Sequence, residues 1–407
     1  MSTDIKQAVI LCGGLGSRLG DLTRDTPKPL LPVNGVPFLQ ILMQDITRYN
    51  VERFLLLAAF RSEKIEDFAR GVAAAIGRRI EVEVAVEPDR AGTGGALFNA
   101  RHMLDEAFLL FNGDSMLDAP LPQLVRLLGE EGRLGALALR HLPEAGRYGV
   151  VELEGDRITT FGARRDASAP AWINGGIYAL RRGLVDQLQP QGSLEQDLLP
   201  RLADEGCLAG LKCDGFFLDI GVPEDFARAQ SAIPAHRVRP ALFLDRDGVL
   251  NVNHGHVGSI ARFEWIEGAR EAVARANALG YYVFVVTNQA GIAKGHYTEA
   301  DYRVLSRHMR SELAIAGGWI DDERYCPFHV DAVTEEFRVD SDWRKPRPGM
   351  LLDIIRHWPI DLSRSIMVGD SDTDMVAAAG AGVRGLLFTG GRLDRFLEAV
   401  LNEGAPS

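Results

Sequence analysis

Short apolar runs alternate with longer amphipathic stretches, and this rhythm occurs twice along the 407-residue chain. In the first third, three β-rich runs are separated by two stretches of helical periodicity: 8–11, 38–49, 53–59, 65–76 and 80–87. The same rhythm restarts after residue 240, beginning with the apolar run 241–245. Strand and helix in alternation predict a parallel sheet covered by helices on both faces. We therefore expect two α/β domains in tandem.

The segment Ser231–Pro240 separates the two rhythms. It contains two prolines and two arginines and has no sustained apolar period, which is typical of a linker. The expected boundaries are a first domain at 1–232, a linker at 233–239 and a second domain at 240–407.

Composition limits the kinds of partner. A net charge of -11 argues against a general surface for nucleic acid, because binding a phosphate backbone requires clustered cations. The four cysteines (Cys12, Cys207, Cys213 and Cys326) are irregularly spaced, which favours a reducing compartment over a disulfide framework. The apolar run near the N-terminus is too short for a signal peptide or a membrane helix. We expect a cytoplasmic protein without membrane or nucleic-acid partners; the sequence leaves open whether it forms a homo-oligomer.

A glycine-rich loop follows the first predicted strand. Gly13, Gly14 and Gly16 allow backbone N–H groups to approach an anion closely at the end of a strand. Arg18 and Lys28 then supply fixed positive charge for phosphoryl oxygens. A dinucleotide fingerprint or an ordinary tight turn are the alternatives. The third glycine of the dinucleotide fingerprint is missing, and no phosphate-binding GxxxxGK[ST] loop occurs.

The string GGxGxRL, followed by T and then PKPL, resembles the signature of the sugar nucleotidylyltransferases. Further matching segments follow in order, so that the resemblance covers roughly residues 6–230. It implies a Rossmann-like, GT-A-like mixed sheet with the nucleotide base bound at the segment EPDRAGTGGAL. The implied nucleotide-binding residues are Gly13, Gly14, Gly16, Glu87, Gly92 and Thr93.

The same resemblance assigns metal and sugar ligands. The strand LLFNGD ends in Asp114 and the segment FFLDIGVPEDF contains Asp219, and this pair is expected to hold Mg²⁺. INGGIY and SLEQD place Asn174 and Glu195 near sugar hydroxyls. Relatives commonly carry a Glu-Lys pair where this chain has GARRD, so Arg165, or its neighbour Arg164, is expected to take the role of the cation.

The chemistry explains these residue types. A sugar 1-phosphate must attack the α-phosphorus of a nucleoside triphosphate and expel pyrophosphate, so two polyanions meet. Mg²⁺ between Asp114 and Asp219, together with Arg18 and Lys28, would neutralise their repulsion and stabilise the developing charge.

Four elements of the second domain predict a phosphatase. Asp245 and Asp247 directly follow an apolar strand, where the first carboxylate can attack phosphorus and the second can serve as general acid. Thr287 and Asn288 end the next strand and offer groups for phosphate oxygens. Lys345 would counter charge at phosphorus. Mg²⁺ is expected at Asp245, Asp247 and Asp370, with Asp374 close behind Asp370.

These elements, in this order, resemble the haloacid-dehalogenase (HAD) phosphatases across residues 240–390. The resemblance implies a HAD-like Rossmannoid domain with a minimal cap. Longer strings, including DRDGVLNVNHGHV and RKPRPGMLL, resemble the heptose 1,7-bisphosphate 7-phosphatase branch, which implies that Arg344 contacts the substrate phosphate.

Enzymes of that branch usually carry a structural zinc held by a Cys-x-His and a Cys-x-Cys pair. Here Cys326 occupies the first position, but Phe328, Ser341 and Trp343 occupy the other three. Even with the adjacent His329, too few ligands remain for a tetrahedral site. Zinc is not expected, and the loop must be ordered by packing, for example through Trp343, or be mobile.

The two resemblances describe consecutive reactions. Removing the 7-phosphate of heptose 1,7-bisphosphate leaves heptose 1-phosphate, the class of substrate that a nucleotidylyltransferase accepts. The N-terminal half resembles the heptose 1-phosphate guanylyltransferases, so GTP is the expected donor and Glu87 could accept from guanine N1–H. The alternative is a mannose or other hexose 1-phosphate nucleotidylyltransferase with a degenerate or histidinol-phosphatase-like C-terminal module.

Overall fold

The computed structural model describes residues 5–87, 91–145, 149–163 and 169–404. The chain divides into two compact units, residues 1–234 and 235–407. Helix α6 (Pro223–Arg237) runs through the point of division, so residues 233–237 are helical where the sequence predicted an irregular linker. The apolar period of this helix is short and consists of Ala229 and Ile233, which are buried one turn apart. The domain limits drawn from the sequence remain predictions.

The first unit is built on a nine-stranded mixed sheet, in the order β5-β4-β1-β6-β11-β8-β12-β10-β9. The strands are β1 (Gln7–Leu11), β4 (Arg53–Ala58), β5 (Glu81–Val86), β6 (Ala107–Asn112), β8 (Gly135–Leu142), β9 (Val150–Glu154), β10 (Arg157–Ala163), β11 (Ala171–Arg181) and β12 (Leu208–Cys213). The four strands β5, β4, β1 and β6 run parallel, as the alternating sequence predicts. Strand β11 then pairs antiparallel with both β6 and β8, which makes the sheet mixed.

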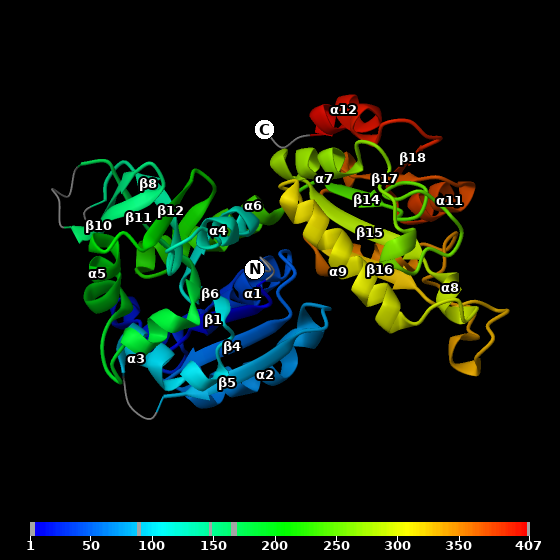
Figure 1. Cartoon of the computed structure of the whole chain (residues 1–407). Coiled ribbons are helices and arrows are strands. Elements are labelled where there is room, and N and C mark those ends of the chain that lie inside the picture. The colour runs from blue at the N-terminus through cyan, green and yellow to red at the C-terminus, as the bar shows by residue number, and fades with distance from the viewer. Residues whose placement is uncertain (1–4, 88–90, 146–148, 164–168, 405–407) are drawn as a thin grey trace. The chain divides into compact units, whose positions relative to one another are not determined.

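Helices cover both faces of this sheet. They are α1 (Phe38–Thr47), α2 (Ser62–Ala75), α3 (Gly92–Asn99), α4 (Leu121–Leu128), α5 (Leu199–Asp204) and α6. Successive residues of β1 show the alternation: Ala8 and Ile10 pack with α1, α2, α4 and α6, whereas Val9 packs with α3 and α5. Two apolar layers therefore sandwich the sheet, and most of the helices that cover it are labelled in Figure 1.

The second unit contains a five-stranded parallel sheet, in the order β16-β15-β14-β17-β18. The strands are β14 (Ala241–Leu244), β15 (Tyr282–Asn288), β16 (Asp322–Cys326), β17 (Ile366–Gly369) and β18 (Arg384–Leu387). The helices are α7 (Ala269–Ala278), α8 (Ala290–Ala293), α9 (Glu299–Ile315), α10 (Gly349–His357), α11 (Asp372–Gly380) and α12 (Leu393–Gly404).

The two faces of β14 are again covered by different helices. Leu242 and Leu244 pack with α7, α9 and α12, whereas Ala241 and Phe243 pack with α10 and α11. Parallel strands buried on both faces are expected to be apolar throughout, as β14 is. Figure 1 shows α7 and α9 beside β14 and β15. The structure thus contains the two α/β units that the sequence predicts, the first with a mixed sheet and the second with a parallel one.

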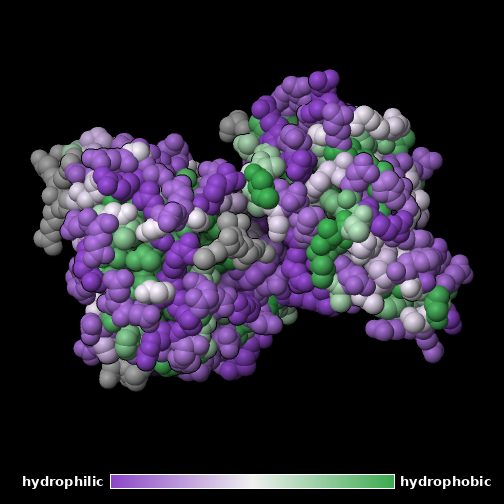
Figure 2. Space-filling model, viewed as in Figure 1, coloured by the Kyte–Doolittle hydropathy of each residue, from purple (hydrophilic) through white to green (hydrophobic). Residues whose placement is uncertain are grey.

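The visible surface of each unit is mostly hydrophilic, with small scattered apolar areas (Figure 2). None of the helices in the described ranges is long and apolar enough to cross a membrane.

Candidate active sites

In the first unit, two separate segments bring Asp114 and Asp219 to one lysine. Asp114 follows β6, and Asp219 ends the short strand β13 (Phe217–Asp219), which pairs antiparallel with β7 (Ser115–Leu117). This pairing places Asp219 opposite Ser115, the residue after Asp114. The Nζ atom of the buried Lys28 lies 2.6 Å from Oδ2 of Asp114 and 3.7 Å from Oδ1 of Asp219. The structure thus gathers the predicted metal ligands around a predicted catalytic cation.

The electrostatics of Asp219 indicate a site made for positive charge. Burial raises the pKa of its carboxyl group, and the nearby Asp114 carboxylate raises it further, while Lys28, the Gly221 N–H and Arg18 oppose the shift. Two carboxylates held close together are stabilised by a cation between them. The pair is therefore suited to bind a divalent metal ion.

The glycine-rich loop follows β1 and lies beside Glu87. A Cβ atom on Gly13 would come within 3.2 Å of Oε1 of Glu87, so the close approach of this side chain favours glycine. Oε2 of Glu87 accepts a hydrogen bond of 3.1 Å from the Ala91 N–H. Burial raises the pKa of the half-buried Glu87 carboxyl group, opposed by this hydrogen bond. Gly14 faces open space, and Gly16 has a left-handed backbone with a φ of 62°.

Thr93 makes contacts that differ from the prediction. Its hydroxyl group donates to Oε2 of Glu195 at 2.6 Å and accepts from the Leu194 N–H at 2.9 Å. Its neighbour Gly92 has a φ of 76°, and a Cβ atom there would meet the Gly192 carbonyl oxygen at 2.4 Å. Thr93 therefore joins the predicted base-binding segment to the predicted sugar-binding segment, and its contact with a nucleotide remains a prediction.

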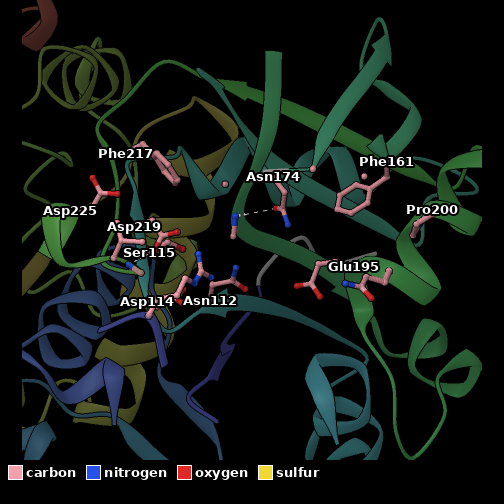
Figure 3. Close-up of a pocket in the computed structure, with 18 residues that line it drawn as sticks. Asn112, Asp114, Ser115, Phe161, Asn174, Glu195, Pro200, Phe217, Asp219 and Asp225 are labelled. Carbon is pink, nitrogen blue, oxygen red and sulfur yellow. Dashed lines mark hydrogen bonds between the residues drawn. The ribbon is translucent and has the colours of Figure 1, made fainter. Parts of the chain in front are cut away.

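A pocket of about 740 Å³ contains five of the predicted side chains of this unit: Arg18, Asp114, Asn174, Glu195 and Asp219. Figure 3 shows Asp114 and Asp219 at one end, Phe161 and Pro200 at the other, and Asn174 between them. The predicted loop glycines and Glu87 do not line this pocket. Sequence reasoning missed Asn112, Ser115, Phe161, Gln196, Phe217 and Asp225, which also line it.

The two predicted sugar ligands are joined through a tyrosine. Nδ2 of Asn174 donates to the Tyr178 hydroxyl at 2.6 Å, and this hydroxyl donates to Oε1 of Glu195 at 3.3 Å. Tyr178 belongs to the INGGIY string, which gave no signal of this role. Arg164 and Arg165, expected to act on the sugar phosphate, lie outside the described residues.

In the second unit, Lys345 lies between two carboxylates. Its Nζ atom is 3.0 Å from Oδ1 of Asp245 and 2.6 Å from Oδ1 of Asp374, and it donates to the Val286 carbonyl oxygen at 2.8 Å. Although burial disfavours the charged amine, the two carboxylates raise the pKa of Lys345. For Asp245, burial raises the pKa of the carboxyl group, and the positive charge of Lys345 opposes this effect. This buried triad is consistent with the predicted role of Lys345 at the reacting phosphorus.

The sequence placed Asp374 close behind the expected metal ligand Asp370 but did not count it among the ligands. Asp374 is fully buried in the first turn of α11, and its carboxylate clusters with those of Asp245 and Asp370 within 4.8 Å. The signal available was its position four residues after Asp370, within the acidic string that follows β17. Asp245, Asp370 and Asp374 together could hold a metal ion.

The Asp247 carboxylate lies outside this cluster of three and is held by donors. Oδ1 and Oδ2 accept from Nη2 of the buried Arg246 at 2.9 and 2.8 Å. Oδ1 also accepts from Asn251 at 3.0 Å, and Oδ2 from Gln289 at 3.1 Å. Three side chains thus fix the position of this carboxylate. The predicted metal contact of Asp247 remains a prediction.

Thr287, Asn288 and Arg344 also surround Lys345 or its loop. The buried Thr287 hydroxyl accepts from Gln289 at 2.9 Å. The Asn288 side chain is used by the backbone of Lys345, with hydrogen bonds of 3.0 and 3.1 Å. Arg344 donates to the Phe328 carbonyl oxygen at 3.4 Å. The structure therefore gives Asn288 a positioning role; the phosphate contacts predicted for Thr287, Asn288 and Arg344 remain predictions.

The loop at the zinc positions is packed by apolar residues. Phe328 and Trp343 pack against the core layer of α10 and α11, and Cys326 is fully buried with a free thiol. Burial raises the pKa of this thiol. Packing through Trp343 is one of the two outcomes expected for this loop, and Trp343 does contact the core.

Comparison with known proteins assigns the first unit. Residues 7–236, more than half of the chain, match the family model described as nucleotidyl transferase. The chain belongs to the nucleotidyl transferase family. Two solved structures of HddC from Yersinia pseudotuberculosis are similar to this nucleotidyl transferase at a TM-score of 0.50, each covering 56% of the chain and 100% of HddC. They are 25% and 26% identical to it, and the second is complexed with GMP-PN.

The C-terminal part of this nucleotidyl transferase matches a second set of proteins. Residues 342–402 match a HAD-hydrolase-like model. The D-glycero-beta-D-manno-heptose-1,7-bisphosphate 7-phosphatase of Rhodopseudomonas palustris is 48% identical over 165 residues, which is 40% of this chain and 92% of that protein. The enzyme of the same name from Photorhabdus laumondii is 42% identical over 165 residues, 40% of this chain and 88% of that protein. The chain thus combines a nucleotidyltransferase with a HAD phosphatase.

Proposed function

We propose that the chain carries out two consecutive steps of nucleotide-sugar synthesis. The C-terminal unit removes the 7-phosphate of D-glycero-D-manno-heptose 1,7-bisphosphate, and the N-terminal unit transfers GMP from GTP to the resulting heptose 1-phosphate. The observation that carries the proposal is the 48% identity to the Rhodopseudomonas palustris phosphatase across 92% of that protein. The names of the similar phosphatases specify the β anomer, so we infer this anomer for the substrate.

The Lys345 triad favours an active phosphatase over a degenerate module. Asp245, Lys345 and Asp374 form a compact charged site. Asp247, two residues after Asp245, accepts hydrogen bonds from three side chains. Burying a cation and two carboxylates carries a desolvation penalty. Catalysis gives a reason for the chain to retain this arrangement. Nothing in the comparisons favours the histidinol-phosphatase-like alternative, because the similar proteins named act on heptose bisphosphate.

A guanine nucleotide is supported for the first unit. The similar protein HddC is complexed with GMP-PN. Glu87 has a carboxylate beside the glycine-rich loop, where it can accept from N1–H and the amino group of guanine. Adenine has no N1–H to offer, so this contact would discriminate between the purines.

The phosphatase reaction follows from the roles of two aspartates. The Asp245 carboxylate attacks the 7-phosphorus, the bond from phosphorus to sugar O7 breaks, and Asp247 gives its proton to the leaving alkoxide. Asp247 then takes a proton from water, which attacks the aspartyl phosphate and releases inorganic phosphate. The positive charge of Lys345 offsets the negative charges of Asp245 and the incoming phosphate, which would otherwise repel each other.

The transferase reaction needs no covalent protein intermediate. A phosphate oxygen of heptose 1-phosphate attacks the α-phosphorus of GTP, and the bond to the β-phosphate oxygen breaks to release pyrophosphate. Lys28 and Arg18 stabilise the charge that gathers on the phosphoryl oxygens. Asn174 and Glu195 hold the sugar in the pocket so that its phosphate faces Asp114 and Asp219.

Mg²⁺ is the cation proposed for both units. The oxygen-only donor sets, Asp114 with Asp219 and Asp245 with Asp370 and Asp374, suit a hard divalent ion. Mg²⁺ would supply charge neutralisation for the phosphates. A cytoplasmic location, where GTP and Mg²⁺ are abundant, is part of the same proposal.

The test follows three products at once. Purified chain is incubated with Mg²⁺, GTP and each anomer of heptose 1,7-bisphosphate, and phosphate, pyrophosphate and GDP-heptose are measured. We expect all three products with the β anomer. Asp245→Asn should release no phosphate from the bisphosphate. The same variant should still form GDP-heptose and pyrophosphate when heptose 1-phosphate is supplied directly. Asp114→Asn should retain phosphate release and form no nucleotide-sugar. Absence of nucleotide-sugar from wild-type chain with either anomer would contradict the transferase proposal.

A further inference from the structure

A network of hydrogen-bonded side chains lies behind the sugar end of the pocket. It begins at Asn174, passes through the Tyr178 hydroxyl to Glu195, and ends at Thr93, with distances of 2.6, 3.3 and 2.6 Å. Backbone groups close both ends, since the Gly176 N–H donates to Oδ1 of Asn174 at 3.1 Å and the Leu194 N–H donates to Thr93 at 2.9 Å. Every side chain in this network thus has a defined donor or acceptor role.

A bulge in β11 brings the first two members together. Asn174 pairs with Leu139 and Ile177 with Ala138, so Gly175 and Gly176 are extra residues in the strand. Residues four apart in a regular strand are about 13 Å apart, too far for the observed hydrogen bond. The bulge shortens this separation, and its residue Gly176 has a φ of 78° that strongly favours glycine. The local backbone is therefore shaped to join Asn174 to Tyr178.

The Tyr178 hydroxyl is fixed as a donor to Glu195. The side chain is fully buried, and burial together with the Glu195 carboxylate raises its pKa well above the ordinary value. The hydroxyl proton is held on the oxygen and directed at the carboxylate. This leaves the second N–H of Asn174 and the remaining lone pairs of Glu195 for a ligand in the pocket that both side chains line.

Figure 3 shows Asn174 and Glu195 on the pocket wall, between the end with Asp114 and Asp219 and the end with Phe161 and Pro200. Tyr178 is not among the lining residues, and its hydroxyl is hydrogen-bonded to these two side chains, which do line the pocket. Its influence on a ligand must therefore be indirect.

We propose that Tyr178 is a positioning residue for sugar recognition, whose hydroxyl sets Asn174 as a donor and Glu195 as an acceptor toward the hydroxyls of the sugar 1-phosphate. This inference rests on the proposed transferase function. Thr93 holds Glu195 from the other side, so the sugar-reading pair is anchored to α3. Without the Tyr178 hydroxyl, Asn174 and Glu195 each lose a hydrogen-bond partner. Their side chains can then rotate away from the positions in which they bind the sugar hydroxyls.

The primary test is Tyr178→Phe, which keeps the buried ring and removes only the hydroxyl. Formation of GDP-sugar is measured while heptose 1-phosphate and GTP are varied separately. We expect the KM for heptose 1-phosphate to rise about 5- to 100-fold, the range for removing one partner of a buried polar group. The KM for GTP should change less than about twofold, since Tyr178 touches no predicted nucleotide ligand directly. Phosphate release from the bisphosphate by the same chain serves as the control for enzyme concentration, and the KM for GTP reports on the folding of the first unit.

A double-mutant comparison separates positioning from a purely structural role. If Tyr178 acts through Asn174, the loss caused by Tyr178→Phe in an Asn174→Ala background should be much smaller than in the wild-type chain. Equal losses in both backgrounds, or an unchanged KM for heptose 1-phosphate in Tyr178→Phe, would overturn the inference. An inactive wild-type chain would instead overturn the proposed transferase function, and the two failures are therefore distinguishable.

A second variant keeps the inference open to test if Tyr178→Phe does not fold. Thr93→Val removes the 2.6 Å donor to Oε2 of Glu195 near the start of α3 and leaves the Ser193 hydroxyl, which donates to the same oxygen at 3.2 Å. The KM for heptose 1-phosphate should rise in this variant as well. A rise in the KM for GTP alone would overturn the inference.

Discussion

Asn288 and Lys345 are joined by two hydrogen bonds: Nδ2 of Asn288 donates to the Lys345 carbonyl oxygen at 3.0 Å, and the Lys345 N–H donates to Oδ1 of Asn288 at 3.1 Å. One side-chain amide thus satisfies both polar groups of the backbone that carries the buried lysine. The end of β15 is in this way connected to the loop that precedes α10, and the position of Nζ between Asp245 and Asp374 depends on that connection.

Replacing Asn288 by alanine should displace Lys345. We expect kcat of the phosphatase to fall about 10- to 100-fold, because a displacement of about 1 Å in a catalytic group has effects of that size. The measurement is steady-state phosphate release from heptose 1,7-bisphosphate. Nucleotidyl transfer by the same variant should be unchanged. A rise in KM with kcat unchanged would indicate that Asn288 contacts phosphate directly, as the sequence predicted.

Glu87 should make the use of GTP dependent on pH. Its pKa is raised by burial, so the carboxylate becomes protonated at a higher pH than an ordinary glutamate does. Only the ionised form accepts from both guanine donors, so the KM for GTP should rise as the pH falls. Initial rates across mildly acidic pH measure this effect.

The matched variants for this prediction are on one segment. Glu87→Gln should raise the KM for GTP at neutral pH and flatten its pH dependence. Glu83→Gln, on the exposed side of β5, should behave like the wild-type chain. The same pH dependence in Glu87→Gln would rule out this residue as the titrating group.

Mg²⁺ should stabilise the phosphatase unit through its acidic cluster. The carboxylates of Asp245, Asp370 and Asp374 lie within 4.8 Å of one another, so a bound cation relieves their repulsion. Saturating Mg²⁺ should raise the melting temperature of this unit by roughly 5 °C or more. Calorimetry with and without Mg²⁺ measures the shift.

Asp370→Asn should lose most of that shift, whereas Asp372→Asn should retain it. Both residues are exposed and lie in the same short segment, but Asp372 is outside the cluster. An undiminished shift in Asp370→Asn would place the cation elsewhere.

Trp343 should stabilise the loop in which the family resemblance would place zinc ligands. It packs against the layer of α10 and α11, so Trp343→Ala should lower the free energy of unfolding of this unit by about 1–3 kcal/mol. The midpoint of phosphatase loss in urea measures the change. Val333→Ala, at a side chain that is 71% exposed, should change it by less than about 0.5 kcal/mol. Zinc bound in equal amount to the purified chain would contradict the packing explanation.

Strand positions and chain order made much of the fold predictable. Apolar runs such as Ala241–Leu244 identify buried strands, and polar residues directly after them, such as Asp114 and Asp245, lie at the edge of the sheet where parallel strands end. Helix α6 was missed because its buried face consists of only Ala229 and Ile233, which is too weak a period to detect around a proline.

Contacts between distant side chains could not be predicted in the same way. The bonds of Asn288 to Lys345 and of Tyr178 to Asn174 and Glu195 depend on rotamers and on a bulge in β11. Polarity alone made Asn288 a candidate ligand for phosphate, whereas the structure uses its amide to hold a backbone. The sequence can therefore identify which residues gather at a site more readily than which of them touch the substrate.

Phe328 and Trp343 have a consequence for the conditions under which the phosphatase can work. A loop held by thiolates loses its shape when zinc is scarce or when oxidants attack sulfur. Here the loop is held by aromatic rings, and the one cysteine at these positions, Cys326, is buried with a raised thiol pKa that disfavours the reactive thiolate. The fold of this loop should therefore persist in a cell under metal starvation or peroxide stress, when a zinc-dependent counterpart would fail.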